Sequence, residues 1–358
     1  MTAQTLPGLE MGPLAGYLAA ELGADADRPF DVQLLAGGRS NVSYRIRQDA
    51  RDWVLRRPPL GNILPSAHDM RREHRLLMGM TTAGFPVPAP LALCEDADVL
   101  GVPFLVMDFV EGRVVADAAD ARALSPAAAR EVSHALVETL ARLHAIDPAD
   151  AGLADLGRPD GYLERQVRRW ADQWQRTRTR ELPDVDALIA WLRERIPRIP
   201  SGLPSSIVHG DFRIDNAILS EDHAKVRAVL DWEMSTLGDP VSDLAISLVY
   251  WSEAGDGLRA EIDVARGVTA GPGFLTRAEL VEAYADASGL DLGHLDACIV
   301  LACFKLAVIM ESIHKRTLEG AQLGDAAREG QGLEAAPAAL ARMGRHVAEG
   351  GGIAALSL

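Results

Sequence analysis

The first third of the chain consists of short runs in which apolar and polar residues alternate, the pattern of β-strands. The stretch "FDVQLLAGGRSNVSYRIRQ" predicts two strands joined at a glycine turn, and "DWVLRRPP" predicts a strand that two prolines end. Two more strands are expected in "VPAPLALCEDADVLGVPFLVMDFVEG", on either side of an acidic turn. Between these regions "AHDMRREHRLLMGMTTAGF" has helical spacing and ends at Gly84. The pattern predicts a small sheet accompanied by one helix.

Beyond this region the apolar residues recur three and four positions apart, which is helical spacing. One helix is expected to begin at the capping pair Ser125-Pro126, and others over about 161–178 and 184–196. Two short apolar runs, "SSIVHGDFRIDNAIL" and "KVRAVLDWE", interrupt the helices as an insert that resembles a β-hairpin. The fold class indicated by these elements is α+β.

The change from strand-like to helix-like sequence falls near Val110–Gly112. We therefore expect a first part over residues 1–110 and a larger, mostly helical part over residues 111–358. The most apolar stretch, "LDACIVLACFKLAVIM", contains Asp296 and Lys305 and is too short to span a bilayer. We interpret it as a buried helix.

Composition narrows the choice of partner and compartment. A net charge of −15 argues against nucleic acid or an anionic membrane as the main partner, since both require a basic surface. The three cysteines show no metal-ligand spacing, so a reducing compartment is favoured over a disulfide framework. The first residues lack the basic and apolar segments of a secretory signal. A cytoplasmic location is expected, and the oligomeric state is left open.

Polar residues follow two apolar runs in the middle of the chain. In "IVHGDFRIDNAIL" Asp211 and Asn216 lie five positions apart, and in "AVLDWE" Asp231 ends the next run. Asp211 and Asn216 alone would be explained by a turn. All three together fit phosphoryl transfer, in which one carboxylate orients the attacking hydroxyl while an amide oxygen and a second carboxylate hold Mg²⁺.

"HGDFRIDN", "VLDWE" and "GDPVSDLA", in this order and spacing, resemble the aminoglycoside-phosphotransferase-like, or small-molecule kinase-like, family over about residues 30–316. The resemblance implies a two-lobed protein-kinase-like fold, with an antiparallel-sheet N-lobe containing one helix and a mostly helical C-lobe. It implies a phosphotransferase with an alcohol group as acceptor, using ATP or GTP and Mg²⁺. Asp211 would then be the catalytic residue, and Asn216 and Asp231 the metal ligands.

These motifs contain three further polar residues. Two of them, His209 and Glu233, have two interpretations each, and Asp243 has a structural one. His209 is either a proton relay or, as we favour, a structural histidine that supports the loop through hydrogen bonds. Asp243 is expected to lie on a helix and to accept hydrogen bonds from the backbone of the catalytic loop, as in the family. Glu233 either reaches a second metal or the substrate, or caps the following turn.

The first part of the chain would supply the nucleotide site. "LAGGRSNVSYRI" lies at the position of the glycine loop, where glycines let backbone N–H groups approach phosphates and neighbouring polar side chains add donors. A plain hairpin turn would also explain the glycines. The residues assigned to this loop are Gly37, Gly38, Ser40 and Asn41.

The next strand should carry the basic residue that binds phosphates. The family has Lys there, whereas this chain reads "WVLRRPP". Because side chains alternate along a strand, Val54 and Arg56 share one face, which places Val54 at the adenine and Arg56 on the phosphates. Arg keeps the charge and adds bidentate donors, but it is bulkier than Lys. Glu73, on the following helix, is the expected ion-pair partner of Arg56.

The segment "FLVMDFVEG" resembles the hinge between the two lobes of the family. Met107 would lie behind the adenine, and the backbones of Asp108 and Val110 would hydrogen-bond to the edge of the base. A hinge of this kind reads the nucleotide through main-chain groups, so these side chains do not distinguish ATP from GTP.

The acceptor is suggested by a second resemblance. "WVLRRPPLGNILPSAHDMRREHRLL" and "GYLERQVRRWADQW" resemble the kinase-like domain that is fused to some acyl-CoA dehydrogenases, which implies a hydroxy-acid or hydroxyacyl-CoA acceptor. Arg165 and Arg169 belong to a cluster of seven arginines from Arg158 to Arg180 that suits an anionic acceptor, and Trp170 lies beside them. Arginines on a helix surface are often only solvated, and such a Trp is more often core.

Two alternatives stay open. One is an aminoglycoside-type antibiotic kinase, whose polycationic substrate would favour a carboxylate-rich pocket. The other is a catalytically weak nucleotide-binding module, a pseudokinase, which the replacement of the family lysine by Arg56 keeps possible. Nucleotidyl transfer on the same fold has no specific support.

Overall fold

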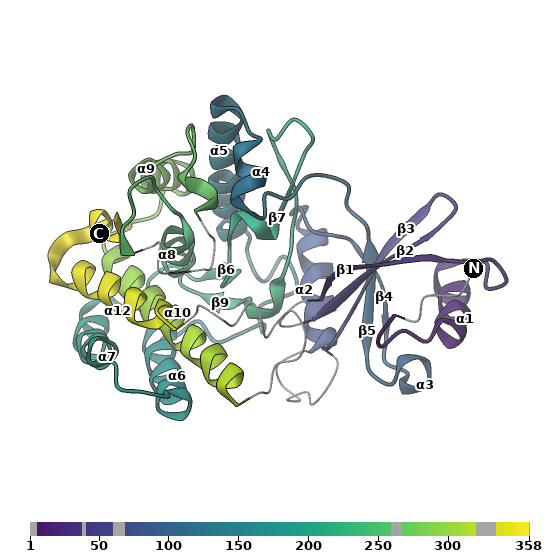
Figure 1. Cartoon of the computed structure of the whole chain (residues 1–358), viewed down its shortest axis with the longest axis horizontal. Helices are drawn as coiled ribbons and strands as arrows, with labels where there is room; N and C mark the ends of the chain where they lie inside the picture. The colour runs from purple at the N-terminus through teal and green to yellow at the C-terminus, as the bar shows by residue number, and fades with distance from the viewer. Residues whose placement is uncertain are drawn as a thin grey trace. The chain divides into compact units, whose positions relative to one another are not determined.

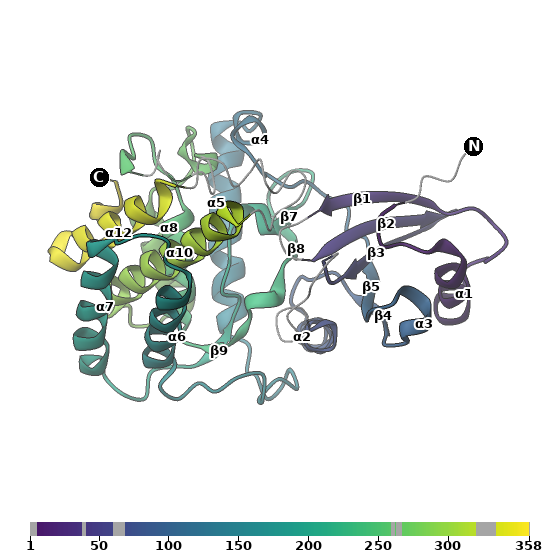
Figure 2. The same cartoon turned by 60° about the horizontal axis from the view of Figure 1, so that its bottom comes forward.

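The computed structural model describes residues 6–37, 41–59, 69–258, 262, 267–319 and 334–357. By their internal contacts the residues form two compact units (Figures 1 and 2). The N-terminal unit comprises Met1–Glu111 and Ala228–Glu233, and the C-terminal unit comprises Gly112–Arg227 and Met234–Leu358. The chain mixes helices with a five-stranded antiparallel sheet, so the predicted α+β class is confirmed.

The sheet of the N-terminal unit has the strand order β1-β2-β3-β5-β4, with antiparallel pairing throughout. Its strands are β1 (Asp31–Gly37), β2 (Val42–Gln48), β3 (Arg51–Arg57), β4 (Pro90–Cys94) and β5 (Phe104–Asp108). Burial alternates along β3: Trp53 and Leu55 are buried on one face, whereas Val54 and Arg56 are half-buried on the other. The alternation expected from the sequence therefore gives the sheet two faces with different roles.

Among the residues that the structure describes, three helices accompany this sheet, so the expectation of a single helix was wrong. They are α1 (Met11–Leu22), α2 (Met70–Thr82) and α3 (Ala97–Leu100). The predicted helix is α2, which Asp69 caps and which ends before Gly84, whose φ is +67°. In contrast, α1 contains two glycines and a proline, so its local sequence favours a helix weakly. It is held by burying Leu14 and Leu18 in the core beneath β2 and β3.

A later segment of the chain belongs to the N-terminal unit, although the sequence pattern placed it in the second part. Within residues 228–233, the backbone N–H of Val229 donates to the carbonyl of Pro86 at 2.9 Å. The Trp232 ring packs edge-on against Phe85, with centroids 5.8 Å apart. This return of the chain brings Asp231 into the same unit as the sheet.

The C-terminal unit is mostly helical. Its helices are α4 (Ala118–Arg122), α5 (Pro126–His144), α6 (Tyr162–Thr177), α7 (Pro183–Arg195), α8 (Pro240–Tyr250), α9 (Arg277–Ser288), α10 (Leu295–Leu318) and α12 (Ala336–His346). Shorter helical turns occur at Ile196–Arg198, Ile214–Asn216, Trp232–Met234, Val268–Ala270, Val347–Gly351 and Gly352–Ser357. The expected helices near 161–178 and 184–196 correspond to α6 and α7, and Ser125 caps α5 as predicted.

Two short strand pairs replace the single hairpin that the sequence suggested. Strand β6 (Ser206–Val208) pairs with β9 (Thr236–Gly238), and β7 (Ala217–Leu219) pairs with β8 (Val226–Val229). The chain between β6 and β7 is the motif "HGDFRIDN", whose two ends are therefore fixed in different strand pairs. The division of the strands between two pairs positions this loop.

Helix α10 is the core of the C-terminal unit, packed against α6, α7, α8 and α12 (Figure 2). It has 24 residues, so by length and composition it could cross a membrane, and the expectation that it is too short was wrong. However, 78% of its most apolar window is buried within the protein. As predicted, it is a buried helix, and Lys305, in its middle, lies among apolar neighbours.

Candidate active site

The loop between β6 and β7 begins with a glycine that no other residue can replace without strain. Gly210 has a φ of +82°, a region that side chains with a Cβ rarely adopt. A Cβ at this position would lie 2.9 Å from the carbonyl oxygen of Met234. The glycine that precedes Asp211 is therefore required by the backbone path.

One buried carboxylate holds the backbone of this loop. The N–H groups of His209 and Gly210 donate to the two oxygens of Asp243 at 2.6 and 2.7 Å. Asp243 lies on α8, and its expected position and backbone contacts are both present. Burial alone would raise its pKa, but the hydrogen bonds and charge of His144, together with His209, keep the pKa below its usual range. Asp243 is thus an ionised anchor for the loop.

The anchor is itself supported by two residues that sequence reasoning missed. The Nε2 atom of His144, on α5, lies 3.2 Å from a carboxylate oxygen of Asp243. The Nδ1 atom of His144 lies 2.5 Å from the hydroxyl of Tyr284, on α9. If the tyrosine donates to Nδ1, then Nε2 carries the proton and donates to Asp243. In the sequence both residues only look like members of apolar helix faces.

The ring of His209 supports the loop from within. It is fully buried, and its Nδ1 atom accepts a hydrogen bond from the backbone N–H of Asp211 at 3.2 Å. Its ring also packs edge-on against Phe212, with centroids 5.9 Å apart. These contacts favour the structural interpretation over a proton relay, because one ring nitrogen is already committed to the backbone.

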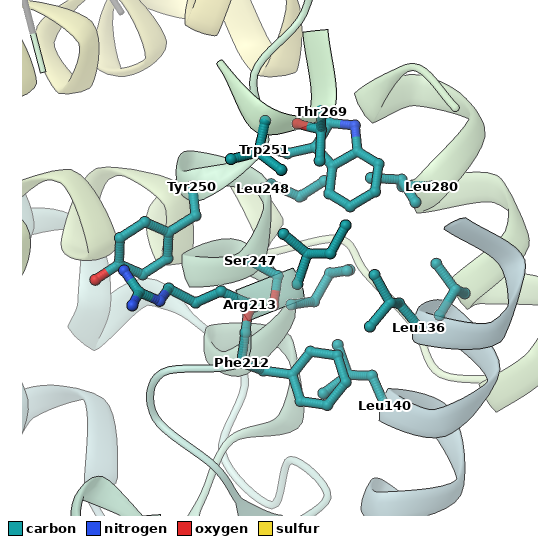
Figure 3. Close-up of a pocket in the computed structure, with 14 residues that line it drawn as sticks. Leu136, Leu140, Phe212, Arg213, Ser247, Leu248, Tyr250, Trp251, Thr269 and Leu280 are labelled. Atoms are coloured by element: carbon teal, nitrogen blue, oxygen red, sulfur yellow. Dashed lines mark hydrogen bonds between the residues drawn. The ribbon is translucent and has the colours of Figure 1, made fainter. Parts of the chain in front are cut away.

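The carboxylate of Asp211 is surrounded by donors. The amide of Asn216 donates to Asp211 Oδ2 at 3.2 Å and to its backbone carbonyl at 2.9 Å. Arg213 lies 3.7 Å from the same carboxylate and 4.9 Å from the centroid of the Tyr250 ring (Figure 3). Burial, and then the charge of Asp211, raise the pKa of Tyr250 well above its usual value, so its hydroxyl stays a donor. The carboxylate is held in place while 21% of the side chain stays exposed.

The two residues expected to bind Mg²⁺ offer suitable atoms, each within its own unit. Because Asn216 uses its NH₂ group on Asp211, its carbonyl oxygen is the atom turned to other partners, and no hydrogen bond reaches it from the described residues. In the N-terminal unit, Asp231 uses one oxygen on Arg56 at 2.7 Å. The second oxygen of Asp231 stays available, and its side chain is 33% exposed. Amide and carboxylate oxygens are the ligands that Mg²⁺ prefers, so the donor set fits.

The structure contains the expected ion pair between β3 and α2. Arg56 Nε lies 2.8 Å from Glu73 Oε1, although this N–H is not aligned for a hydrogen bond. Burial alone would lower the pKa of Arg56, but Glu73 and Asp231 raise it above its usual value. Asn41 adds a contact to the other oxygen of Glu73 at 3.5 Å. Arg therefore occupies the strand position of the family lysine with two carboxylate partners.

The residues expected to contact the base include two on adjacent strands. Val54 is the cross-strand neighbour of Met107 in the β3–β5 register. The N–H of Asp108 donates to the carbonyl of Ala89 at 2.9 Å, which leaves only the Asp108 carbonyl for a base. In the part of the chain that the structure describes, no backbone partner reaches the N–H of Val110. A carbonyl acceptor and an N–H donor two residues apart suit recognition of a base edge.

The glycine loop is described only at its two ends. Gly37 ends β1 and pairs with Val42, and Asn41 is buried next to Glu73. Gly38 and Ser40, the other residues assigned to this loop, lie outside the described residues. The phosphate-binding role of the loop stays a prediction.

The arginine cluster is not a single patch. Arg165 donates to the backbone carbonyls of Arg158 and Asp160, at the start of α6. Arg180 contacts the buried carboxylate of Glu311 at 3.3 Å. These contacts favour structural roles for both arginines, and nothing in them supports a substrate contact for Arg165.

Arg169 and Trp170 lie closer to the loop. Trp170 is buried and donates through its indole N–H to Gln166 at 3.0 Å, while Arg169 is exposed over its ring at 5.6 Å. Trp170 and Gly210 line the same cavity of about 30 Å³, together with Lys305 of α10. Nothing in the sequence pattern indicated that α10 contributes to this cavity. Glu233, in the N-terminal unit, adds its charge to those facing Arg56.

A second cavity of about 40 Å³ lies on another side of the loop, among α5, α8 and α9 (Figure 3). Apart from Arg213 and Tyr250, its lining is mostly apolar and includes Leu136, Phe212 and Trp251. The carboxylate of Asp211 does not line it. We regard this cavity as a packing feature of the helical core.

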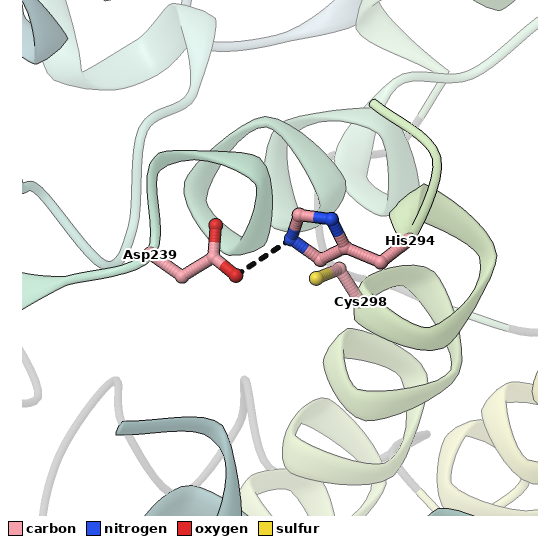
Figure 4. Close-up of side chains that lie close together, drawn as sticks. All are labelled: Asp239, His294 and Cys298. Carbon is pink, nitrogen blue, oxygen red and sulfur yellow. Dashed lines mark hydrogen bonds and ion pairs between the residues drawn. The ribbon is translucent and has the colours of Figure 1, made fainter. Parts of the chain in front are cut away.

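A buried group of metal-ligating residues also occurs in the C-terminal unit (Figure 4). Asp239 caps α8 through one oxygen and accepts a hydrogen bond from His294 on the other, at 2.7 Å. Burial raises the pKa of the neighbouring Cys298 thiol well above its usual value. Because each polar group is satisfied or neutral without an ion, this cluster is explained as a helix cap joined to α10.

Comparisons with known proteins agree with this geometry. A sequence model of the phosphotransferase enzyme family matches residues 31–298. The chain is 35% identical over 328 residues to acyl-CoA dehydrogenase family member 11 of the rat, a match that covers 89% of this chain but only 41% of the relative. It thus spans about two fifths of the length of that relative.

Solved structures give the same fold. A candidate aminoglycoside phosphotransferase from Ralstonia eutropha has a TM-score of 0.74 at 28% identity, covering 93% of this chain and 98% of the other. An aminoglycoside phosphotransferase solved with GDP and kanamycin has a TM-score of 0.58 at 16% identity, covering 90% and 97%. The family match extends over well more than half of the chain. The chain therefore belongs to the phosphotransferase enzyme family and is a kinase-like phosphotransferase that acts on hydroxyl groups.

Proposed function

We propose that this phosphotransferase moves the γ-phosphate of ATP or GTP to a hydroxyl of a small molecule, with Asp211 orienting and deprotonating that hydroxyl. The arrangement of the loop supports this role most directly. The backbone before Asp211 is anchored by Asp243, and the carboxylate keeps its position through Asn216 and Tyr250. A fixed, partly exposed carboxylate is what positioning an acceptor hydroxyl requires.

We further propose Asn216 and Asp231 as the Mg²⁺ ligands. Each has an oxygen that its protein partners leave available. The ion would neutralise the charge that develops on the nucleotide phosphates. Asp211 itself is engaged by Asn216 and Arg213, which suits a residue that handles the acceptor rather than the ion.

The nucleotide site would be formed by the N-terminal unit. Arg56, held by Glu73, would contact the phosphates, and Val54 and Met107 would pack against the base. The carbonyl of Asp108 and the N–H of Val110 would bind the base edge. A distant relative of the same fold was solved with GDP, so both ATP and GTP are candidate donors.

For the acceptor we propose a hydroxy acid or a hydroxyacyl-CoA. The similarity to members of the acyl-CoA dehydrogenase family supports this class. Arg169 and Trp170 lie near the catalytic loop and would contribute to the acceptor site; Arg165 and Glu233 are weaker candidates. The three cysteines are buried thiols, which supports a cytoplasmic setting.

An acceptor screen tests the proposal. The purified chain is given MgATP or MgGTP with hydroxy acids, hydroxyacyl-CoA thioesters and kanamycin-type amines, and nucleoside diphosphate release is measured. Asp211→Ala is the control for contaminating activity. We expect turnover with the acids or thioesters, and preference for the amines would contradict the acceptor class.

A nucleotide-binding module with little catalysis is the second candidate. The observation in its favour is that Arg56 contacts Asp231, a proposed metal ligand. If no acceptor in the screen is phosphorylated while Mg-nucleotide binds tightly, this candidate replaces the first.

A further inference from the structure

Outside the sequence motifs, Lys305 is a charged residue that lies beside the loop of residues 209–216. It lies in the middle of α10, whose neighbouring positions are apolar and buried, and it lines the cavity of about 30 Å³ beside the catalytic loop. A lysine in such a place costs free energy unless its ammonium has partners that need it. Its sequence surroundings, "ACFKLAV", offer none.

Its partner is the catalytic loop. Lys305 Nζ donates to the carbonyl oxygen of Gly210 at 2.7 Å. The N–H of Gly210 donates to Asp243, and the next N–H, that of Asp211, donates to His209. The peptide that joins Gly210 to Asp211 is therefore held at both its carbonyl and its N–H.

The charges around Lys305 show why an ammonium is placed there. Burial lowers its pKa, while Asp211 and Asp243 oppose that effect and Arg169 adds to it. Trp170 contributes its ring face, 5.9 Å from Nζ. The cation thus interacts favourably with both the anchor carboxylate and the catalytic carboxylate, and it offsets the repulsion between them.

We propose that Lys305 is a positioning residue: it fixes the peptide that carries Asp211 and thereby sets the direction of the catalytic carboxylate. This inference rests on the proposed function of Asp211. It assigns to α10, which contributes none of the sequence motifs, a direct part in the geometry of transfer. Misplacement of a catalytic group by about 1 Å costs up to about 100-fold in rate.

The test compares three variants. Lys305→Met removes the charge and the donor with a similar shape, and Lys305→Arg restores both. Lys315→Met is the matched control, because Lys315 lies on the same helix and also donates to a backbone carbonyl, that of Arg176, at 2.9 Å. We expect kcat to fall roughly 10- to 100-fold in Lys305→Met with nucleotide KM little changed. Lys305→Arg should recover much of kcat, and Lys315→Met should match wild type.

A pH profile distinguishes this role from simple packing. Because burial lowers the pKa of Lys305, wild-type kcat should fall on the alkaline side earlier than an ordinary lysine would allow. Arg stays charged above pH 12, so Lys305→Arg should extend activity to higher pH. The titratable groups that face Lys305 are Asp211 from the loop, Asp243 from α8, Arg169 and Tyr162 from α6, and Cys298 from α10. Burial raises the pKa values of both Tyr162 and Cys298. Neither group therefore explains a fall in kcat at alkaline pH that Lys305→Arg abolishes.

Hydrogen exchange separates failure of this inference from failure of the proposed function. Exchange in the peptide 206–219 should accelerate in Lys305→Met but not in Lys315→Met, whether or not an acceptor is found. If wild type shows no transfer but the exchange result holds, the proposed function fails and the positioning of the loop stands. If wild type transfers phosphate and Lys305→Met matches it in kcat and in exchange, the inference is overturned.

Discussion

Replacing the loop anchor by its amide, Asp243→Asn, isolates the contribution of one carboxylate to the catalytic loop. Asp243 accepts hydrogen bonds from the N–H groups of His209 and Gly210 and lies 3.2 Å from His144. An asparagine keeps one acceptor oxygen and turns an NH₂ donor toward the second amide. At least one buried N–H then loses its acceptor, and the contact with His144 loses its charge.

The size of the destabilisation expected in Asp243→Asn follows from these contacts. An unsatisfied buried donor costs about 1–3 kcal/mol, and with the weakened histidine contact we expect a destabilisation of about 3 kcal/mol. For a chain of 358 residues that corresponds to a fall in Tm of roughly 4 °C. Because the peptide before Asp211 loses a fixed end, kcat should also fall roughly 10- to 100-fold.

The stability difference should depend on pH with a definite sign. The pKa of Asp243 is below its usual range in the native protein, so its contribution is fully present above the unfolded carboxyl's pKa of about 4. It is lost as pH falls through the lower native pKa. The gap in Tm between wild type and Asp243→Asn should therefore be constant above about pH 5 and narrow below about pH 4.

Thermal melts monitored by circular dichroism, together with nucleoside diphosphate release, provide the assay. Asp222→Asn is the control, since Asp222 is an exposed carboxylate that accepts from Ser220 and Ala224 in its own turn. It should leave Tm and kcat close to wild type. Equal Tm and kcat in Asp243→Asn and wild type would refute the anchoring of the loop by Asp243.

Two further predictions concern the loop and the nucleotide site. Gly210→Ala forces a side chain into a φ of +82° and toward Met234, so strain of about 1–3 kcal/mol should lower both Tm and kcat. The control is Gly202→Ala, where the φ is +79° and the space is open, and it should lower Tm but leave kcat unchanged. Arg56→Met leaves Glu73 buried without its cation, so the variant should bind Mg-nucleotide at least about 10-fold more weakly by calorimetry, whereas Arg56→Lys should restore most of the affinity. Unchanged kcat in the first variant, or unchanged affinity in the second, would contradict these roles.

The grouping of polar residues in the loop over residues 209–216 was predictable because its signal is local. Asp211, Asn216 and Asp243 lie in motifs whose spacing can be read along the chain, and the structure gives Asp243 the backbone contacts expected of it. The strand positions of Val54 and Arg56 followed from alternation alone. Periodicity and turn residues are properties of neighbouring positions, so they can be recognised without knowledge of the fold.

The supports of the loop were not predictable because they come from distant elements. Lys305 reaches Gly210 across 95 positions, and His144 reaches Asp243 across 99. A lysine within an apolar helix and a histidine on an amphipathic one carry no local sign of their partners. The return of residues 228–233 to the N-terminal unit is of the same kind.

For the arginine cluster the sequence predicted too much, because it indicated a shared anionic binding site that the structure does not support. Adjacent arginines in the sequence indicated one anionic site, but Arg165 is engaged by backbone carbonyls and Arg180 by Glu311. Guanidinium groups have several donors and satisfy them wherever carbonyls are close. Of the cluster, Arg169 keeps the clearest connection to the catalytic loop, through Trp170.

The most direct test of the central claim is a comparison of transfer and binding in Asp211→Asn. Single-turnover phosphoryl transfer is measured with the best acceptor of the screen, and Mg-nucleotide affinity is measured by calorimetry on the same preparation. We predict that transfer falls about 100-fold or more while the Kd for Mg-nucleotide changes less than about threefold. Transfer at the wild-type rate in Asp211→Asn would contradict the assignment of this carboxylate to catalysis.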